Sequence, residues 1–155
     1  MAWNFSLGYK KRLYNIAAKI LEDRIKVSHL AIANAQASAN EEEKSSAGDK
    51  YETSRAMSHL EKDMYAKQLA SNKNELAALL AIDCTKLYHS ILPGTIINCG
   101  ECKFFIAAGL GKIIFDEEIV YLISPKAPLS NLFYNKKIRD TILFNGKELV
   151  INEIY

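Results

Sequence analysis

Five acidic side chains gather near the middle of the sequence: Glu41, Glu42, Glu43, Asp49 and Glu52. Carboxylate oxygens are the ligands that hard divalent cations such as Mg²⁺ prefer. Asp49 and Glu52 are three residues apart, so on a helix they lie on one face. We take these two as the first candidates for a functional role and Glu41 and Glu42 as the second. The competing interpretation is that Asp49 caps a helix and Glu52 is an ordinary surface charge.

Two segments of helical periodicity flank this acidic cluster. Apolar residues recur at helical spacing over about residues 9–40 and again over about residues 47–82, whereas residues 1–7 are expected to form a short lead-in. Ser46 is a suitable N-cap for the second helix, and Asp49, three residues later, completes a box-like arrangement. A connection this short forces the two helices to run antiparallel. We therefore expect a long helical hairpin.

The charges of the first helix oppose its dipole. Lys10, Lys11 and Arg12 lie near its amino end and Glu41 to Glu43 near its carboxyl end. The dipole favours the reverse order by about 0.3–1 kcal/mol per charge. One explanation is that the helix ends before Glu41 and leaves a solvated acidic loop. The other is that the tip of the hairpin is built to carry negative charge to a partner.

A different pattern begins after the second helix. Short runs of β-branched and aromatic residues predict strands, and they cover residues 95–97, 103–106, 112–115, 119–123, 141–144 and 148–154. Residues 127–133 predict a short helix, and Asn145-Gly146 is the strongest hairpin-turn signal in the chain. The predicted fold class is α+β. The hairpin covers residues 1–86, with its acidic tip near residues 41–52, and a small antiparallel β domain covers residues 87–155.

Composition and charge exclude several classes of protein. The 155 residues carry a net charge of +2, so non-specific binding to nucleic acid through counterion release is not an evident role. No apolar run approaches the roughly 20 residues that cross a bilayer, and the start of the sequence lacks the order of a signal peptide. We therefore expect a cytoplasmic protein that does not bind a membrane. The sequence also lacks the phosphate-loop, nucleophile-elbow and metalloprotease motifs of common enzymes.

The cysteines raise one metal-site hypothesis. Cys99 and Cys102 form a C-x-x-C pair, and Cys84 and His89 precede it. These are the ligand types that structural zinc takes. The competing interpretation is that residues 99–102 form a tight turn between two strands. An odd count of three cysteines does not indicate the disulfide framework of a small secreted protein.

Two stretches of the sequence carry a resemblance to a known family. The first is SAGDKYETSR, in which Ser46, Tyr51 and Arg55 stand at corresponding places. The second is SPKAPLSNLFYNKKIRDTILFNGKELVINEIY, which runs from Ser124 to Tyr155. With these stretches the chain resembles the Gre-type transcript cleavage factors of bacterial RNA polymerase. That family combines an amino-terminal antiparallel coiled coil, which has an acidic tip, with an FKBP-like carboxyl-terminal domain.

The sequence departs from the family pattern at informative positions. In the family an Asp and a Glu, three residues apart, flank the tip serine, whereas Lys44 and Ala47 hold those positions here. Asn135 and Arg139 stand where the family usually has glycines. The chain therefore resembles a divergent member, in which neighbouring carboxylates would have to replace the family's pair.

The resemblance implies a transcription elongation factor that acts on RNA polymerase. The hairpin would enter the polymerase's secondary channel, and its tip carboxylates would help to hold a second Mg²⁺ for cleavage of backtracked RNA. The protein would contact nascent RNA only indirectly, would bind no specific DNA sequence and would have no independent enzymatic activity. Partner contacts are expected at the tip and in the carboxyl-terminal domain, and the candidate residues are Ser46, Tyr51, Arg55, Ser124, Pro125 and Leu129.

Two other functions remain open at this point. A Gre-like protein could regulate polymerase without stimulating RNA cleavage. Alternatively, the coiled coil could be a protein-interaction or dimerisation module, since the apolar stripe of the second helix is as narrow as a coiled-coil seam. We expect a monomer rather than a dimer.

Overall fold

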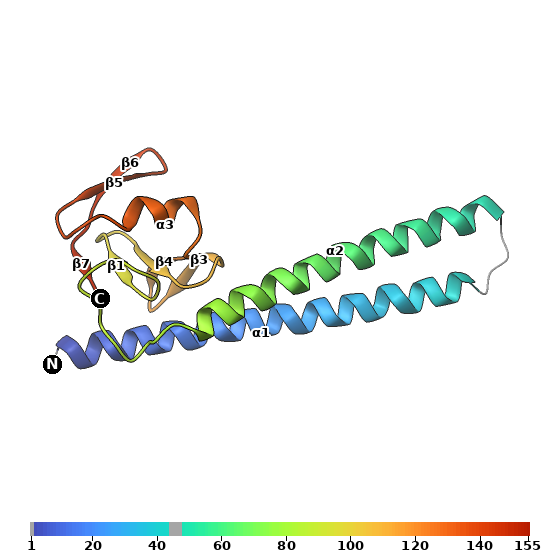
Figure 1. The fold of residues 1–155 in the computed structure, drawn as a ribbon, viewed down its shortest axis with the longest axis horizontal. Coiled ribbons are helices and arrows are strands. Elements are labelled where there is room, and N and C mark those ends of the chain that lie inside the picture. Colours follow the sequence, from blue (N-terminus) through green and yellow to red (C-terminus); the bar gives the residue numbers. More distant parts are fainter. Residues whose placement is uncertain (1, 44–47) are drawn as a thin grey trace. The chain divides into compact units, whose positions relative to one another are not determined.

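The computed structural model describes the backbone of residues 2–43 and 48–155 and the side chains of residues 6–41 and 52–155. The chain divides into two compact units. The first, here called the mixed unit, consists of residues 1–19 and 75–155, and the second, the hairpin unit, consists of residues 20–74. Figure 1 shows the long helices and the strands from which these units are built.

The two predicted long helices are confirmed. Helix α1 spans Ala2–Glu43 and helix α2 spans Gly48–Leu80. Helix α1 begins before the predicted lead-in ends, because neither Pro nor Gly interrupts residues 2–7 and the side chains there tolerate a helix. It also continues through Glu43, so the explanation that it ends before Glu41 is wrong. Its last turn therefore carries acidic residues without any basic one, against the preference of the helix dipole.

Small and polar residues form most of the seam of the hairpin unit, in which α1 and α2 run side by side (Figure 1). The buried residues of the seam include Leu21, Ser28, Ala35 and Ala39 on α1 and Ser58 on α2. Across the seam, Lys62 Nζ donates a hydrogen bond to Gln36 Oε1 at 2.6 Å. Because Ala and Ser bury little apolar area, this seam contributes less hydrophobic stabilisation than a leucine-rich coiled coil would.

The mixed unit contains a five-stranded sheet with the order β3-β4-β2-β1-β7. The strands are β1 (Ile96–Asn98), β2 (Lys103–Ile106), β3 (Gly111–Phe115), β4 (Glu118–Ile123) and β7 (Glu153–Ile154). All neighbours are antiparallel except β2 and β4, which are parallel with Phe105 opposite Leu122. The prediction of an antiparallel domain is thus correct only in part. Strands β3 and β4 form an antiparallel hairpin, and β4 rather than β3 lies next to β2.

The predicted last strand, residues 148–154, is divided in two. Strands β5 (Thr141–Phe144) and β6 (Lys147–Val150) form a separate hairpin, and β7 joins the sheet beside β1. Asn145 and Gly146 have φ angles of 51° and 76°, as a two-residue type I′ turn requires. The division lies at Ile151 and Asn152, where the Asn152 N–H donates instead to the carbonyl of Asn98 at 2.8 Å.

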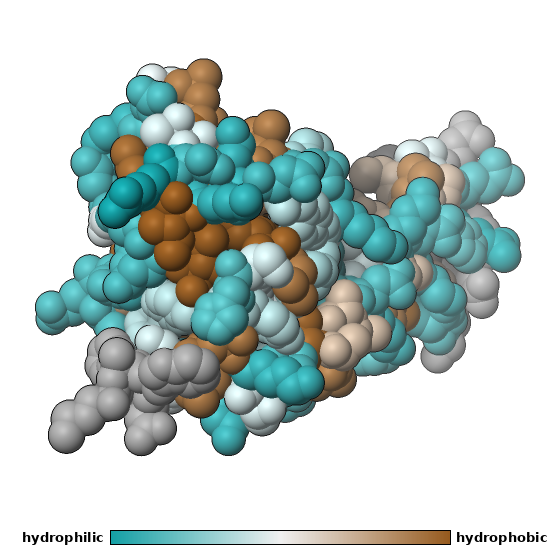
Figure 2. Space-filling model, turned by 60° about the vertical axis from the view of Figure 1, so that its left-hand side comes forward, coloured by the Kyte–Doolittle hydropathy of each residue, from teal (hydrophilic) through white to brown (hydrophobic). Residues whose placement is uncertain are grey.

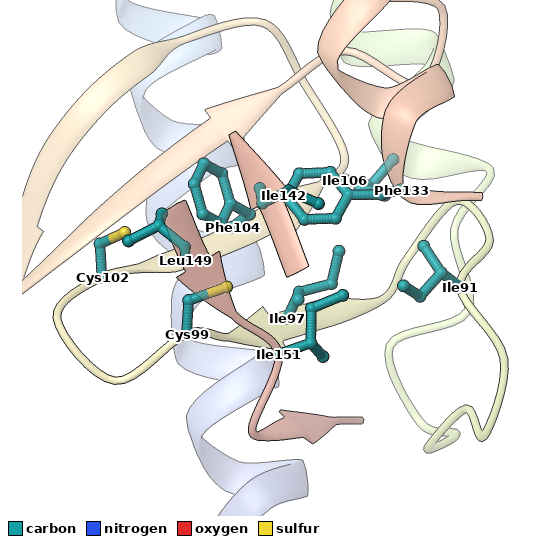
Figure 3. Packing of buried hydrophobic residues seen from close by; sticks show 10 residues of the cluster. All are labelled: Ile91, Ile97, Cys99, Cys102, Phe104, Ile106, Phe133, Ile142, Leu149 and Ile151. Atoms are coloured by element: carbon teal, nitrogen blue, oxygen red, sulfur yellow. The ribbon is translucent and has the colours of Figure 1, made fainter. Parts of the chain in front are cut away.

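A hydrophobic core joins the sheet to the β5–β6 hairpin and to helix α3 (Pro128–Phe133). The fully buried Phe104 ring lies at its centre, 5.0 Å from the ring of Phe133 and 5.2 Å from that of Phe144. Figure 3 shows Phe104, Ile106, Ile142 and Phe133 packed together. Because these residues come from three different elements, β2, β5 and α3, the core fixes the sheet, the β5–β6 hairpin and α3 to one another.

Apolar residues also reach the surface of both units. Figure 2 shows brown apolar patches among teal hydrophilic residues. In the mixed unit the exposed large apolar residues include Ile114, Leu132, Ile138, Leu143 and Val150. In the hairpin unit they include Val27, Leu30, Met57, Leu60 and Met64. Several isolated exposed residues are ordinary for a soluble protein, whereas a contiguous stripe indicates a contact surface.

Candidate functional site

The two helix ends at the tip of the hairpin unit carry the predicted functional carboxylates. Glu41, in the last turn of α1, and Glu52, in the second turn of α2, are both exposed to solvent. Arg55 is exposed one turn further along α2. The remaining candidates, Glu42, Ser46, Asp49 and Tyr51, lie outside the residues whose side chains are described. The described carboxylates can therefore reach a partner without a conformational change in α1 or α2.

The second predicted contact region, around Ser124, is tied into the mixed unit by its backbone. The Ser124 carbonyl accepts a hydrogen bond from Ser130 Oγ at 2.6 Å, and the Pro125 carbonyl accepts one from the Tyr134 hydroxyl. Leu129 is partly buried and packs against the hydrophobic core. These three residues hold the start of α3 in place, so a partner would touch their exposed neighbours, of which Leu132 keeps 55% of its surface exposed.

Helix α1 is fixed to the sheet by a polar cluster that the sequence did not indicate. The Tyr9 hydroxyl donates to Glu118 Oε2 at 3.3 Å, and the ammonium group of the buried Lys103 pairs with the same oxygen. Lys103 Nζ also lies 4.3 Å from the centre of the Tyr9 ring, within the range of a cation–π contact. Burial and the Glu118 carboxylate raise the pKa of Tyr9, so its hydroxyl stays protonated and remains a donor.

Lys10 is a second feature of α1 that the sequence analysis missed. It is fully buried, donates to the Lys86 carbonyl at 2.9 Å and lies 4.2 Å from the centre of the Tyr88 ring. Burial lowers the pKa of Lys10 from its usual 10.5 to about 8, although Cys84 and Asp83 oppose that change. A signal was present, because Lys10 precedes the buried Leu13 and Ala17 by three and seven residues on the same helical face.

The four residues of the zinc hypothesis lie in different environments. Cys99 and Cys102 are buried beside Leu149 in the hydrophobic core (Figure 3). Cys84 is half-buried and His89 is exposed in the segment between α2 and β1. Burial raises the pKa of Cys99 to about 11 and also raises that of Cys102, so both thiols resist the deprotonation that zinc binding requires. Within the described part of the chain, no group of three or more His, Cys, Asp or Glu side chains is placed to hold a metal ion.

The Cys99–Cys102 segment fits the alternative interpretation of a tight turn. The Cys99 N–H donates to the Cys102 carbonyl at 3.0 Å, and the intervening Gly100 has a φ angle of 84°. The Gly100 N–H is in turn held by Asn98 Oδ1 at 2.9 Å. These contacts connect β1 to β2 and turn both thiols toward the core.

Comparison of the chain with known protein families, with curated proteins and with solved structures gives no match in any of the three. Among the helices in the described ranges, none combines the length and the apolar character needed to cross a membrane.

Proposed function

We propose that this protein is a Gre-like factor that inserts its helical hairpin into the secondary channel of RNA polymerase. One observation carries the proposal. Helices α1 and α2 end and begin within a few residues of each other, at Glu43 and Gly48, and they bear exposed carboxylates at Glu41 and Glu52 on either side. An acidic end on a slender pair of helices suits delivery of charge into a narrow channel. The FKBP-like assignment of the carboxyl-terminal region belongs to the same proposal.

The carboxylates would act as supplementary ligands. Carboxylate oxygens have the chemistry that Mg²⁺ requires, and Glu52 with Asp49, or Glu41 with Glu42, would share an ion with the polymerase's own carboxylates. When held there, Mg²⁺ supplies a bound water of lowered pKa and stabilises charge on the phosphate. The chain itself orients oxygen atoms and adds negative charge. It needs no independent catalytic centre to do so.

The mixed unit would provide the docking surface. Lys126, Pro128 and Leu132 are exposed around α3, while the backbone beneath them is fixed by the hydrogen bonds to Ser124 and Pro125. An exposed leucine on a rigid support is a suitable interface contact, because little conformational entropy is lost on binding. Leu132→Ser should therefore weaken binding without disturbing the hydrophobic core.

A backtracked elongation complex with 3′-labelled RNA tests the proposal. Adding the protein with Mg²⁺ should release short 3′ fragments, and the double variant Asp49→Asn with Glu52→Gln should lower the cleavage rate at least about tenfold, because the charged oxygens that favour the second ion are lost. The matched control, Glu61→Gln with Asp63→Asn, removes two exposed charges elsewhere on α2. Binding without fragment release would indicate regulation without cleavage, and absence of binding would refute the proposal.

An interaction module is the second candidate, and the exposed apolar residues of the hairpin unit favour it. Val27, Leu30, Met57, Leu60 and Met64 are each 47–69% exposed on helices that lack a thick core of their own. Multi-angle light scattering over a range of concentrations tests this candidate. A stable dimer that Met57→Ser with Leu60→Ser converts to a monomer would support it, and a monomer at all concentrations would exclude self-association.

A further inference from the structure

Two adjoining cavities in the mixed unit belong to neither the hairpin tip nor the α3 surface. The larger, of about 450 Å³, is lined on its polar side by His89, Asn135, Lys136 and Lys137. The smaller, of about 260 Å³, is lined by residues that include Tyr88, Tyr155 and Leu87. His89, Ile138 and Ile154 line both cavities, so the two lie next to each other. The volume of the larger cavity lies within the range of about 300–1,000 Å³ that is common for ligand sites, and such sites combine apolar walls with a few polar groups.

The larger cavity is positively charged. Two lysines line it, and no acidic side chain is among its lining residues in the described part of the chain. Asp140, which is outside this lining, accepts the Lys137 backbone N–H at 2.8 Å and so fixes the loop. Lys136 is held from its backbone as well, donating to the Phe133 carbonyl at 2.9 Å. The loop is thus fixed by its main chain while its ammonium groups stay available to an anion.

The smaller cavity has the opposite character. Tyrosine and leucine side chains provide flat and apolar walls, and burial raises the pKa of Tyr155 so that its hydroxyl stays neutral. Glu153, an acidic residue in its lining, accepts a hydrogen bond from Asn98 Nδ2 at 2.9 Å. An aromatic ring can stack against tyrosine there, and a carboxylate at the edge can accept from a ring amine or a sugar hydroxyl.

We propose that the two cavities together form a binding site for a nucleoside phosphate. The phosphate lies between Lys136, Lys137 and His89, and the base occupies the compartment walled by Tyr88 and Tyr155. Charge-assisted hydrogen bonds from lysine favour a phosphate over a neutral group, and the aromatic compartment favours a ligand that also carries a ring. This inference does not depend on polymerase binding, because every group that it uses lies within the mixed unit.

Titration of the full-length ¹⁵N-labelled protein, without polymerase, tests this site. The probes are adenosine 5′-monophosphate, adenosine and inorganic phosphate at constant ionic strength. Adenosine 5′-monophosphate should shift the amide signals of residues 87–91, 134–138 and 153–155, whereas phosphate should shift only those of residues 134–138 and of His89. Adenosine should bind at least about tenfold more weakly than its monophosphate, since it lacks the charged partner of the lysines.

Paired variants separate a built site from general attraction to a cationic surface. Lys136→Met with Lys137→Met should weaken binding of the monophosphate at least about tenfold. The control, Lys19→Met with Lys112→Met, removes the same charge from exposed positions outside the cavities and should leave affinity within about twofold, the change expected from long-range charge alone. Equal losses in both double variants, or amide shifts spread over all exposed lysines, would overturn the proposal. So would the absence of saturable shifts at millimolar probe.

Discussion

The buried Lys10 offers the sharpest test of how the mixed unit is stabilised. The pKa of Lys10 is lowered from 10.5 to about 8, and at 1.36 kcal/mol per pH unit the buried charge costs about 3 kcal/mol at pH 7. Lys10→Met shortens the unbranched side chain by one atom and removes the charge. It also removes the hydrogen bond to the Lys86 carbonyl, which costs about 1 kcal/mol. We therefore expect Lys10→Met to raise the free energy of unfolding by about 2 kcal/mol at pH 7.

The stability advantage of Lys10→Met over the wild type should decrease as the pH rises. Below pH 8 Lys10 is protonated in both states, so the wild type carries the full cost of burying the charge. Between pH 8 and 10.5 the folded protein binds fewer protons at Lys10 than the unfolded chain does. The cost therefore disappears as the pH rises through this window. The advantage of Lys10→Met should shrink by about 1.4 kcal/mol per pH unit over the same range.

Urea unfolding at pH 7, 8.5 and 9.5, followed by near-ultraviolet circular dichroism, measures this difference. The signal reports the aromatic cluster of Phe104, Tyr121 and Phe144 in the mixed unit. The pKa values of Tyr9, Tyr155 and Cys99 are raised in the folded protein, so stability falls at high pH as these groups ionise in the unfolded chain. This loss is the same in the wild type and in Lys10→Met, so it cancels in the difference between them.

The matched control is Lys11→Met, which removes a charge from the adjacent, exposed position. Its stability difference from the wild type should stay within about 0.5 kcal/mol, as for most surface substitutions. If Lys10→Met is destabilising at pH 7, or if its effect is the same at pH 7 and 9.5, the reasoning from desolvation is refuted. The contacts of the ammonium group with Tyr88 and Lys86 would then outweigh the cost of burying it.

Three further predictions concern single contacts of the mixed unit. Cys84 should react with a thiol reagent in the native protein, whereas Cys99, whose pKa is raised to about 11, should react only at the rate of unfolding. Mass-mapped labelling in increasing urea shows which cysteine reacts first, and simultaneous labelling of both would contradict the prediction. Gly94→Ala should lower the free energy of unfolding, measured by thermal unfolding, by about 2 kcal/mol or more, because φ is 99° and the new Cβ would lie 2.8 Å from Ile82 Cγ2. Gly146→Ala is the control for backbone strain alone, since Gly146 has a φ of 76° and open space around it. Glu118→Gln should destabilise the protein by about 1–3 kcal/mol, since Lys103 would lose its charged partner while remaining buried. Glu117→Gln, at an exposed position, is the control. Equal stability of the two variants would mean that Lys103 finds another partner.

The sequence predicted those elements whose pattern is local. Apolar periodicity predicted both long helices, and Asn145-Gly146 predicted the turn after β5. Runs of β-branched residues predicted β2 and β5 with the bounds that the structure has. The parallel pairing of β2 with β4 could not be predicted in this way, because strand direction depends on which strand lies next to which. The break at Ile151 was also hidden, since an apolar residue at a break looks like one inside a strand.

For the candidate site, too, only residues that are close together in the sequence could be predicted. The acidic tip is contiguous in sequence, so composition alone located Glu41 and Glu52. The Tyr9–Lys103–Glu118 cluster and the cavities beside Lys136 join residues that are far apart in the chain, and no spacing rule connects them. Lys10 differs, because its burial could have been inferred from spacing: it is a charged residue at a position of the buried helical face where an apolar residue was expected.

The contact between Tyr9 and Glu118 has a consequence for synthesis of the protein on the ribosome. The two residues are 109 positions apart, so at about 5–20 residues per second the first helix waits roughly 5–20 s for the strand against which it packs. During that interval Tyr9 lacks Lys103, Phe115 and Glu118, which contact it in the finished protein. The α2 segment is made before the sheet, so it is the first part of the chain that can pack against α1.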